Sequence, residues 1–258
     1  MEDSSKNSER FIEKAPGFLK EILPYVSPTL FEIIDLPQAS IKMAKLSYQF
    51  LFDRGVGDVS DGLKNHLPEN IILDEFQGEV LQEMSDKEFG EKVLEFFFTQ
   101  IFAGQSMFLD LRKDNFQRKG QVIQFIPNGL HYTFSREFIE GLRKLYVGFY
   151  LEQDQTYEEG LREVGLISAS DSDEVINEMK TLFKNHFGEG DQTSVHFEIS
   201  KFTDSFQAVF KHVFHQRKRL PVEFAFLGIY LVTLYLNLGE IEEGLDVRAS
   251  FMKVHSAE

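Results

Sequence analysis

Apolar residues recur at helical spacing along most of the chain, which predicts a mainly α-helical protein. Residues 1–15 are polar without an apolar face and are expected to form a loose terminus. Ser27-Pro28-Thr29 is typical of a helix start, and Pro37 is expected to interrupt the helix that follows it. The other helices are predicted at residues 17–25, 40–52, 94–102, 135–151, 155–164, 171–188, 202–216, 221–238 and 240–254, with a loop at 188–193.

The middle of the chain departs from this helical pattern. Residues 106–109 are predicted as a short strand and residues 110–115 as a polar loop. A β-hairpin follows at residues 115–126, because a Lys119-Gly120 turn separates two runs rich in apolar residues. One further strand is predicted at residues 71–73. The expected fold is therefore a helical bundle with a small β-hairpin.

Two motifs stand directly before this hairpin, FFTQIF at residues 97–102 and FLDLRKDN at residues 108–115. Their order resembles the UbiB/AarF (ADCK-like) family of atypical kinases, which has a helix ending in FxxQxF, an HxDPHPGN loop and a hairpin closing on DFG. By this resemblance Asp110 takes the position of the catalytic Asp, and Asn115 that of the metal-binding Asn. Residues 154–165 and 217–221 also follow the family's order, so the resemblance covers roughly residues 88–245 and implies a kinase-like C-terminal lobe.

Several positions depart from the family's pattern. The His, Pro and Gly of the loop are replaced by Phe108, Leu111 and Asp114, and the Asp of the DFG triplet is replaced by Pro127. The residues before Asp110 read as helices without a lysine-bearing strand, so the N-terminal nucleotide-binding lobe is expected to be absent or rebuilt. The implied regions are a flexible terminus at 1–15, a helical region at 16–87 and a kinase C-lobe-like domain at 88–258.

The amino-acid composition limits the kinds of molecule that the protein is expected to bind. A net charge of −15 argues against nucleic acid, because phosphate recognition needs a basic surface. The basic run HQRKR at residues 215–219 is the segment suited to lipid headgroups and to peripheral membrane contact. The lack of cysteine and of an apolar leader predicts a cytoplasmic protein, membrane-associated at most through that run. The apolar stretch at residues 222–238 is expected to be a buried core helix rather than a membrane span.

Candidate metal ligands are few. His212 and His215 lie three residues apart on one predicted helix and could form half a metal site, but no acidic residue stands three or four positions before either of them. No metal site is therefore predicted from the histidines. Asp114 and Asn115 are the residues that could hold a weak metal or nucleotide contact.

Three functions from different classes remain open. The first is a catalytically degenerate pseudokinase that binds or scaffolds a partner protein or a lipid, which the resemblance places in lipid or isoprenoid-quinone (ubiquinone) metabolism; it needs no cofactor. The second is an atypical ATPase or kinase that uses ATP and magnesium, with Asp110 orienting the nucleophile and Asp114 and Asn115 as rebuilt metal ligands. The third is an unrelated all-α protein that binds an apolar ligand or a partner. The missing DFG Asp favours the first, because phosphoryl transfer depends on metal ions that neutralise the phosphates.

Overall fold

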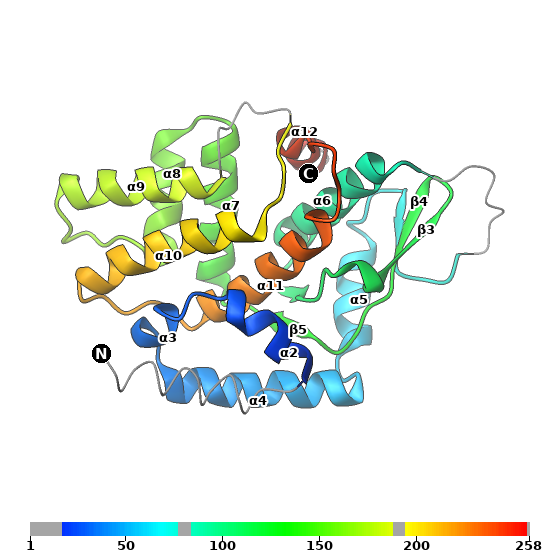
Figure 1. Ribbon diagram of the computed structural model, residues 1–258, viewed down its shortest axis with the longest axis horizontal. Coiled ribbons are helices and arrows are strands. Elements are labelled where there is room, and N and C mark those ends of the chain that lie inside the picture. The colour runs from blue at the N-terminus through cyan, green and yellow to red at the C-terminus, as the bar shows by residue number, and fades with distance from the viewer. Residues whose placement is uncertain (1–16, 77–83, 188–193, 257–258) are drawn as a thin grey trace.

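The computed structural model describes residues 17–76, 84–187 and 194–256. The terminus predicted at residues 1–15 and the loop predicted at 188–193 lie outside the described residues. In the described part the chain is mainly α-helical with two small β-sheets, which confirms the predicted fold class (Figure 1).

The helices follow one another with short connections. In chain order they are α2 (Gly17–Ile22), α3 (Leu30–Ile33), α4 (Leu36–Phe52), α5 (Val56–Lys64), α6 (Asp86–Ala103), α7 (Arg136–Tyr150), α8 (Asp154–Glu163), α9 (Asp173–Phe187), α10 (Ile199–His215), α11 (Glu223–Leu238) and α12 (Val247–His255). Two 3-10 turns, η1 (Leu23–Tyr25) and η2 (Lys113–Asn115), complete the helical elements.

Capping side chains explain where two of these helices begin. Ser135 accepts a hydrogen bond from the backbone N–H of Phe138 at 3.4 Å, so α7 begins where its apolar pattern predicts. Helix α6 begins eight residues before its predicted start. There Ser85 and Glu88 form a capping box, in which each side chain accepts a hydrogen bond from the other residue's backbone N–H.

The prediction that Pro37 interrupts a helix is wrong. Helix α3 ends at Ile33, and Pro37 lies in the first turn of α4. Asp35 caps this turn, because its Oδ1 accepts a hydrogen bond from the N–H of Gln38 at 3.0 Å. The first turn tolerates proline because its N–H groups have no partner within the helix.

The helix predicted at residues 240–254 is also wrong in its first half. Val195 and Leu245 form an antiparallel bridge with two hydrogen bonds of 2.9 Å, which holds this part of the chain extended. Helix α12 begins only after Asp246, whose Oδ1 accepts a hydrogen bond from the N–H of Ala249 at 2.8 Å. A tertiary contact therefore overrides the local helical pattern.

Helix α11 lies in the centre of the protein. Its side chains are buried around nearly the whole circumference, as expected for the apolar stretch at residues 222–238 (Figure 1). Tyr230 stacks on Phe97 of α6 with ring centroids 4.9 Å apart and donates a hydrogen bond to the backbone oxygen of Phe97 at 2.9 Å. No helix in the described ranges combines the length and the apolar character that are needed to cross a bilayer.

The middle of the chain forms two small β-sheets. Strands β3 (Phe116–Lys119) and β4 (Val122–Phe125) form the predicted hairpin, and β1 (Ile71–Ile72) pairs with β4 in parallel. Strands β2 (Ser106–Phe108) and β5 (His131–Thr133) form a second, antiparallel sheet. The two sheets hold the polar loop after residue 108 at both of its ends.

Helix α4 runs along the lower edge of the molecule as drawn (Figure 1). Its inner face buries Ala39, Met43 and Leu46, and Lys42 donates a hydrogen bond to the hydroxyl of Tyr132 on β5 at 2.6 Å. The helix thereby covers the segment that leads from the hairpin into β5.

Candidate functional site

Side chains of the central helix, α11, bind the backbone of the loop that follows β2. The hydroxyl of Thr233 on α11 donates to the backbone oxygen of Leu109 at 2.6 Å and accepts from the N–H of Leu111 at 3.1 Å. Asn237, one turn further along α11, donates to the oxygen of Leu111 at 2.7 Å. These two buried polar residues therefore fix the backbone on both sides of Asp110.

Helix α6 holds the beginning of the same loop. The amide oxygen of Gln100 accepts a hydrogen bond from the N–H of Phe108 at 2.8 Å, and its amide nitrogen lies 3.2 Å from the hydroxyl of Tyr230. Phe108 occupies the position at which the resembled family has a histidine. Its ring is fully buried and packs on Phe125, with centroids 5.4 Å apart. Phe108 therefore anchors the loop in the apolar core and offers no polar group to a catalytic or binding site.

Asp110 is buried and its carboxylate is enclosed by partners. The guanidinium of Arg112 binds it in a bidentate manner, with Nε 2.8 Å from Oδ1 and Nη2 2.8 Å from Oδ2. The backbone N–H of Arg112 also donates to Oδ1 at 3.3 Å, and Asn128 donates to Oδ2 at 3.2 Å. Burial by itself raises the pKa of Asp110, but the hydrogen bonds and charge of Arg112, together with Asn115, outweigh it, and the pKa lies below its ordinary value. The carboxylate is therefore ionised and already paired.

The structure brings Asn115 to Asp110 but leaves Asp114 apart from it. The amide nitrogen of Asn115 donates to the backbone oxygen of Asp110 at 3.1 Å. Its side-chain oxygen, the atom that would bind a metal, lies 3.4 Å from the amide nitrogen of Asn128. Asp114 is exposed on η2 and makes no hydrogen bond or ion pair with any residue that the structure describes.

The orientation of the Asn128 amide decides what this cluster can hold. Its oxygen accepts a hydrogen bond from the N–H of Leu130 at 2.9 Å, so its nitrogen must face Asp110 and Asn115. An N–H donor therefore points at the two oxygens that a cation would need. A metal ion could bind there only after this hydrogen-bond network had been broken.

Helices from the first part of the chain approach this cluster. Glu21 on α2 lies 3.3 Å from Nη1 of Arg112, and Asp53 after α4 accepts a hydrogen bond from the N–H of Gly129 at 3.2 Å. Gly129 packs so closely on α4 that an added Cβ would lie 2.1 Å from the backbone oxygen of Gln49. Residues 17–64 are helical apart from short connections, in the region where the family has its nucleotide-binding lobe.

The remaining sequence candidates lie elsewhere. His212 is buried on α10, with its Nδ1 3.3 Å from Oε1 of Glu178 on α9, whereas His215 is exposed. In the described part of the chain no three His, Asp or Glu side chains gather as a metal site. Of the basic run at 215–219, Lys218 forms an ion pair with Asp171, and Arg219 donates to the backbone oxygen of Ile34 at 3.1 Å. Much of this run is thus engaged within the protein.

Sequence patterns did not identify two residues at the Asp110 cluster and a third residue that lies apart from it. Arg112 and Asn128 enclose the carboxylate of Asp110, and Glu95 is a buried acid on the otherwise apolar helix α6. The only signal for Glu95 was a charge inside the run LEFFFTQIF. A cavity of about 920 Å³ lies beside Glu95. Neither Asp110 nor Asn115 lines it.

Comparison with known proteins identifies no relative. No protein-family model matches the chain, and no curated protein matches it. The resemblance to the UbiB/AarF family therefore rests on the motif residues and their order along the chain.

Proposed function

We propose that the protein is a non-catalytic, kinase-like binding protein in which the Asp110 loop is a structural element. One observation carries this proposal: both carboxylate oxygens of Asp110 are hydrogen-bonded to Arg112, and the residue is only 1% exposed. A catalytic Asp at this position must instead be free to accept the proton of an incoming hydroxyl or to orient a water molecule.

The neighbouring residues support the same conclusion. Phosphoryl transfer relies on metal ions held by oxygen ligands, and here the amide nitrogen of Asn128 faces the oxygens of Asp110 and Asn115. Pro127 stands where the family's metal-binding Asp would be, and proline has no ligating side-chain atom. The loop thus lacks the metal ligands that a catalytic loop of this family would need.

A binding role requires a surface, and α4 supplies one. Six large apolar side chains are exposed in the described ranges, and four of them lie on or at the end of this helix: Ile41, Tyr48, Leu51 and Phe52. With exposed Ala44, the residues at 41, 44, 48 and 51 repeat at the spacing of a coiled-coil seam. The face opposite this seam is already buried in the core, so the seam is a second apolar stripe without a partner in the described chain.

Charge indicates which partner fits this seam. Helix α4 contains two lysines and no acid, and Lys45, beside the seam, has no acidic residue within 4 Å in the described part of the chain. Self-association through antiparallel α4 helices would bring Lys45 close to its own copy, which is unfavourable. We therefore infer that the partner is a protein that presents an amphipathic helix with acidic residues beside its apolar stripe. By the resemblance to the UbiB/AarF family, this partner belongs to lipid or isoprenoid-quinone metabolism.

A thermal-shift titration with ATP and Mg²⁺ or Mn²⁺ tests the loss of catalysis. A ligand at a hundred times its dissociation constant stabilises a fold by roughly 2.7 kcal/mol, which would raise the melting temperature by about 5 to 10 °C. We expect no metal-dependent shift for the wild type at millimolar nucleotide. A shift that is present in the wild type and absent in Asp110→Asn would overturn the proposal and assign Asp110 to catalysis.

A further inference from the structure

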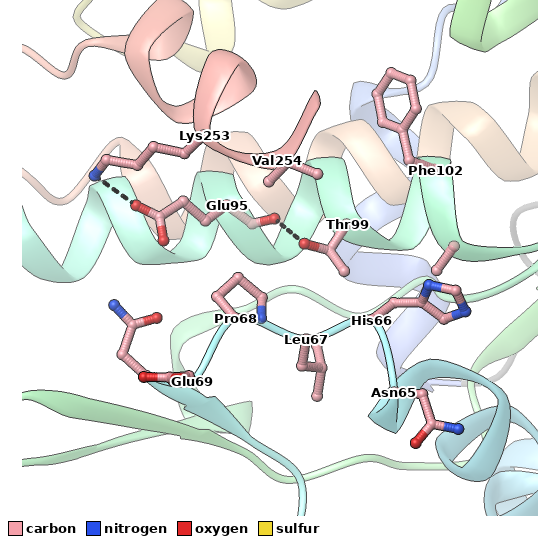
Figure 2. Close-up of a pocket in the computed structure, with 12 residues that line it drawn as sticks. Asn65, His66, Leu67, Pro68, Glu69, Glu95, Thr99, Phe102, Lys253 and Val254 are labelled. Carbon is pink, nitrogen blue, oxygen red and sulfur yellow. Dashed lines mark hydrogen bonds and ion pairs between the residues drawn. The ribbon is translucent and has the colours of Figure 1, made fainter. Parts of the chain in front are cut away.

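A cavity of about 920 Å³ lies between α6, α12 and the segment that joins α5 to β1 (Figure 2). In Figure 2 Glu95 and Thr99 form one wall, and His66, Leu67 and Pro68 form the opposite wall. Its volume lies within the range of small-molecule sites in proteins. It is separate from the Asp110 loop and from the α4 seam, so nothing proposed above accounts for it.

The most unusual group in this cavity is the carboxylate of Glu95. Its side chain is 4% exposed, while its partner Lys253 is 60% exposed, and their Oε1 and Nζ atoms lie 2.8 Å apart (Figure 2). The other carboxylate oxygen, Oε2, accepts no hydrogen bond from any residue that the structure describes. Oε2 is not among the side-chain oxygens that are buried without a partner, so it is accessible from the cavity and can accept a hydrogen bond from a further donor.

Further side-chain oxygens line the cavity with Glu95, together with the polar side chains of Asn65 and His66. Glu69 also lines the cavity, and Asn70 holds a buried side-chain oxygen that no donor in the described chain reaches. A hydrogen bond from Lys253 to Glu95 raises the pKa of the lysine, burial opposes this, and the charges of Glu91 and Asp246 raise the pKa further. The surroundings are therefore suited to a cation, and among the described residues the one cation that reaches Glu95 is Lys253, whose side chain is mostly exposed to solvent.

The rest of the cavity lining is suited to a short alkyl chain. Leu67, Pro68, Phe102 and Val254 line it beside the carboxylate. An incoming ammonium can take the place of Lys253, because the lysine side chain is 60% exposed and its Nζ is solvated by water when it leaves, while Glu95 keeps a cationic partner throughout. An anion, in contrast, would have to displace Glu95 from Lys253 and then lie beside the carboxylates of Glu95 and Glu69.

We propose that this cavity binds a primary alkylammonium group. The ammonium donates to Glu95 in place of Lys253, and its alkyl chain packs against Leu67, Pro68 and Val254. Two sources share this chemistry, a free alkylamine and the lysine side chain of a peptide, and the test below separates them.

Isothermal titration calorimetry of the full chain tests the site with three probes: hexylamine, the capped peptide acetyl-Gly-Lys-Gly-amide, and hexanoate as an anion of similar length. We expect the wild type to bind at least one of the two amines at millimolar concentration and not to bind hexanoate. Preference for hexylamine indicates a free amine as the ligand, and preference for the peptide indicates a lysine-bearing partner.

Two variants at the ion pair must change this affinity in opposite directions. Glu95→Gln keeps the shape of the side chain and removes its charge, so amine binding should weaken at least about tenfold. Lys253→Ala removes the competing ammonium, so amine binding should tighten several-fold. Lys253→Ala leaves the Glu95 carboxylate, which is 4% exposed, without its cation and is the variant at risk of not folding. Glu95→Gln leaves no buried charge unpaired, so it should fold even where Lys253→Ala does not, and the weakening alone then decides.

Three results would overturn the proposal. The first is weaker amine binding in Lys253→Ala, and the second is binding of hexanoate that Lys253→Ala abolishes; each would mean that the lysine is the recognition group. The third is the absence of amine binding in both the wild type and Lys253→Ala.

Discussion

The ion pair between Asp110 and Arg112 is asymmetric in burial. The Asp110 side chain is 2% exposed and that of Arg112 is 28% exposed, and Arg112 also reaches Glu21 on α2. Arg112 therefore has an alternative charged partner and access to water, whereas Asp110 has Arg112 as its one cationic partner among the described residues and is almost closed to water. Loss of the arginine should consequently destabilise the protein more than loss of the aspartate's charge.

We expect Arg112→Ala to lower the free energy of unfolding by about 3 to 5 kcal/mol, because it leaves a buried carboxylate without its main partner. Asp110→Asn should cost only roughly 1 to 3 kcal/mol, because it removes hydrogen bonds but buries no unpaired charge. Urea denaturation of both variants measures the two values. Equal losses, or a larger loss in Asp110→Asn, would contradict the structural role proposed for this pair.

The same pair predicts a dependence of stability on pH. The pKa of Asp110 is lowered in the folded protein relative to its ordinary value of 3.8, so in this range the unfolded chain binds more protons than the folded protein. The stabilisation is therefore complete above the ordinary pKa and disappears as the pH falls through the lower, folded value. The difference in unfolding free energy between wild type and Asp110→Asn should accordingly be constant above about pH 5 and shrink as the pH falls below the ordinary pKa of 3.8.

Sequence patterns located Asp110 and Asn115 but not their partners. The motif resemblance depends on spacing along the chain, and the structure places these two residues together, with Asn115 donating to the backbone oxygen of Asp110. It assigned the triplet after the hairpin to a lost metal ligand at Pro127, whereas the side chain that enters the cluster is that of Asn128. Which of two neighbouring side chains points inward depends on the backbone between β4 and β5, and no local pattern fixes that.

At the level of elements, helix α4 packs directly on the backbone of the segment after the hairpin. A Cβ on Gly129 would lie 2.1 Å from the oxygen of Gln49 and 2.7 Å from the Cα of Phe50. These are backbone atoms of α4, so no rotation of a side chain can relieve the clash. The helix itself would have to move.

We expect Gly129→Ala to destabilise the protein by about 1 to 3 kcal/mol or more. Gly62→Ala is a matched control, because that glycine lies in α5 with no atom within 4 Å of an added Cβ. Alanine is the better helix former there by up to about 1 kcal/mol, so the control should be neutral or stabilising. Thermal unfolding of both variants would contradict this packing if Gly129→Ala melted at the wild-type temperature.

The existence of most helices was predictable, and their ends were predictable where a side chain marks them. Helices α7 to α10 follow from apolar periodicity, which a single buried face imposes on the sequence, and α11 follows from its continuous apolar run. The start of α6 needed the capping box of Ser85 and Glu88, and the start of α12 needed a bridge between Val195 and Leu245. Val195 and Leu245 are fifty positions apart in the sequence, so the local pattern placed the start of α12 too early.

At the scale of the whole molecule, surfaces formed by distant segments were beyond the reach of sequence patterns. The cavity beside Glu95 is lined by residues 65–70, by α6 and by the last helix, which only the tertiary fold brings together. The α4 seam, in contrast, lies within one helix. Its two apolar stripes can be read from the sequence, but which stripe faces the core is a property of the fold.

The α4 seam makes a prediction that depends on the protein as a whole. The protein's net charge of −15 repels an acidic partner at long range. At physiological salt, however, electrostatic repulsion is screened beyond about 8 Å. Contact between the seam and Lys45 should then determine the preference. A synthetic helical peptide with leucine at its seam and glutamate beside it should bind more tightly than the same peptide with lysine beside its seam.

The double substitution Tyr48→Glu with Leu51→Glu should abolish this binding and change the stability by no more than about 0.5 kcal/mol, because both side chains are exposed. Asn177→Glu with Thr181→Glu adds the same charge to exposed positions of α9 and should leave binding intact. Fluorescence anisotropy with the labelled peptides measures both effects. Tighter binding of the lysine peptide would refute an acidic partner. Dimerisation of the protein, or binding to lipid vesicles, that the α4 double substitution abolishes would instead assign the seam to self-association or to a membrane surface.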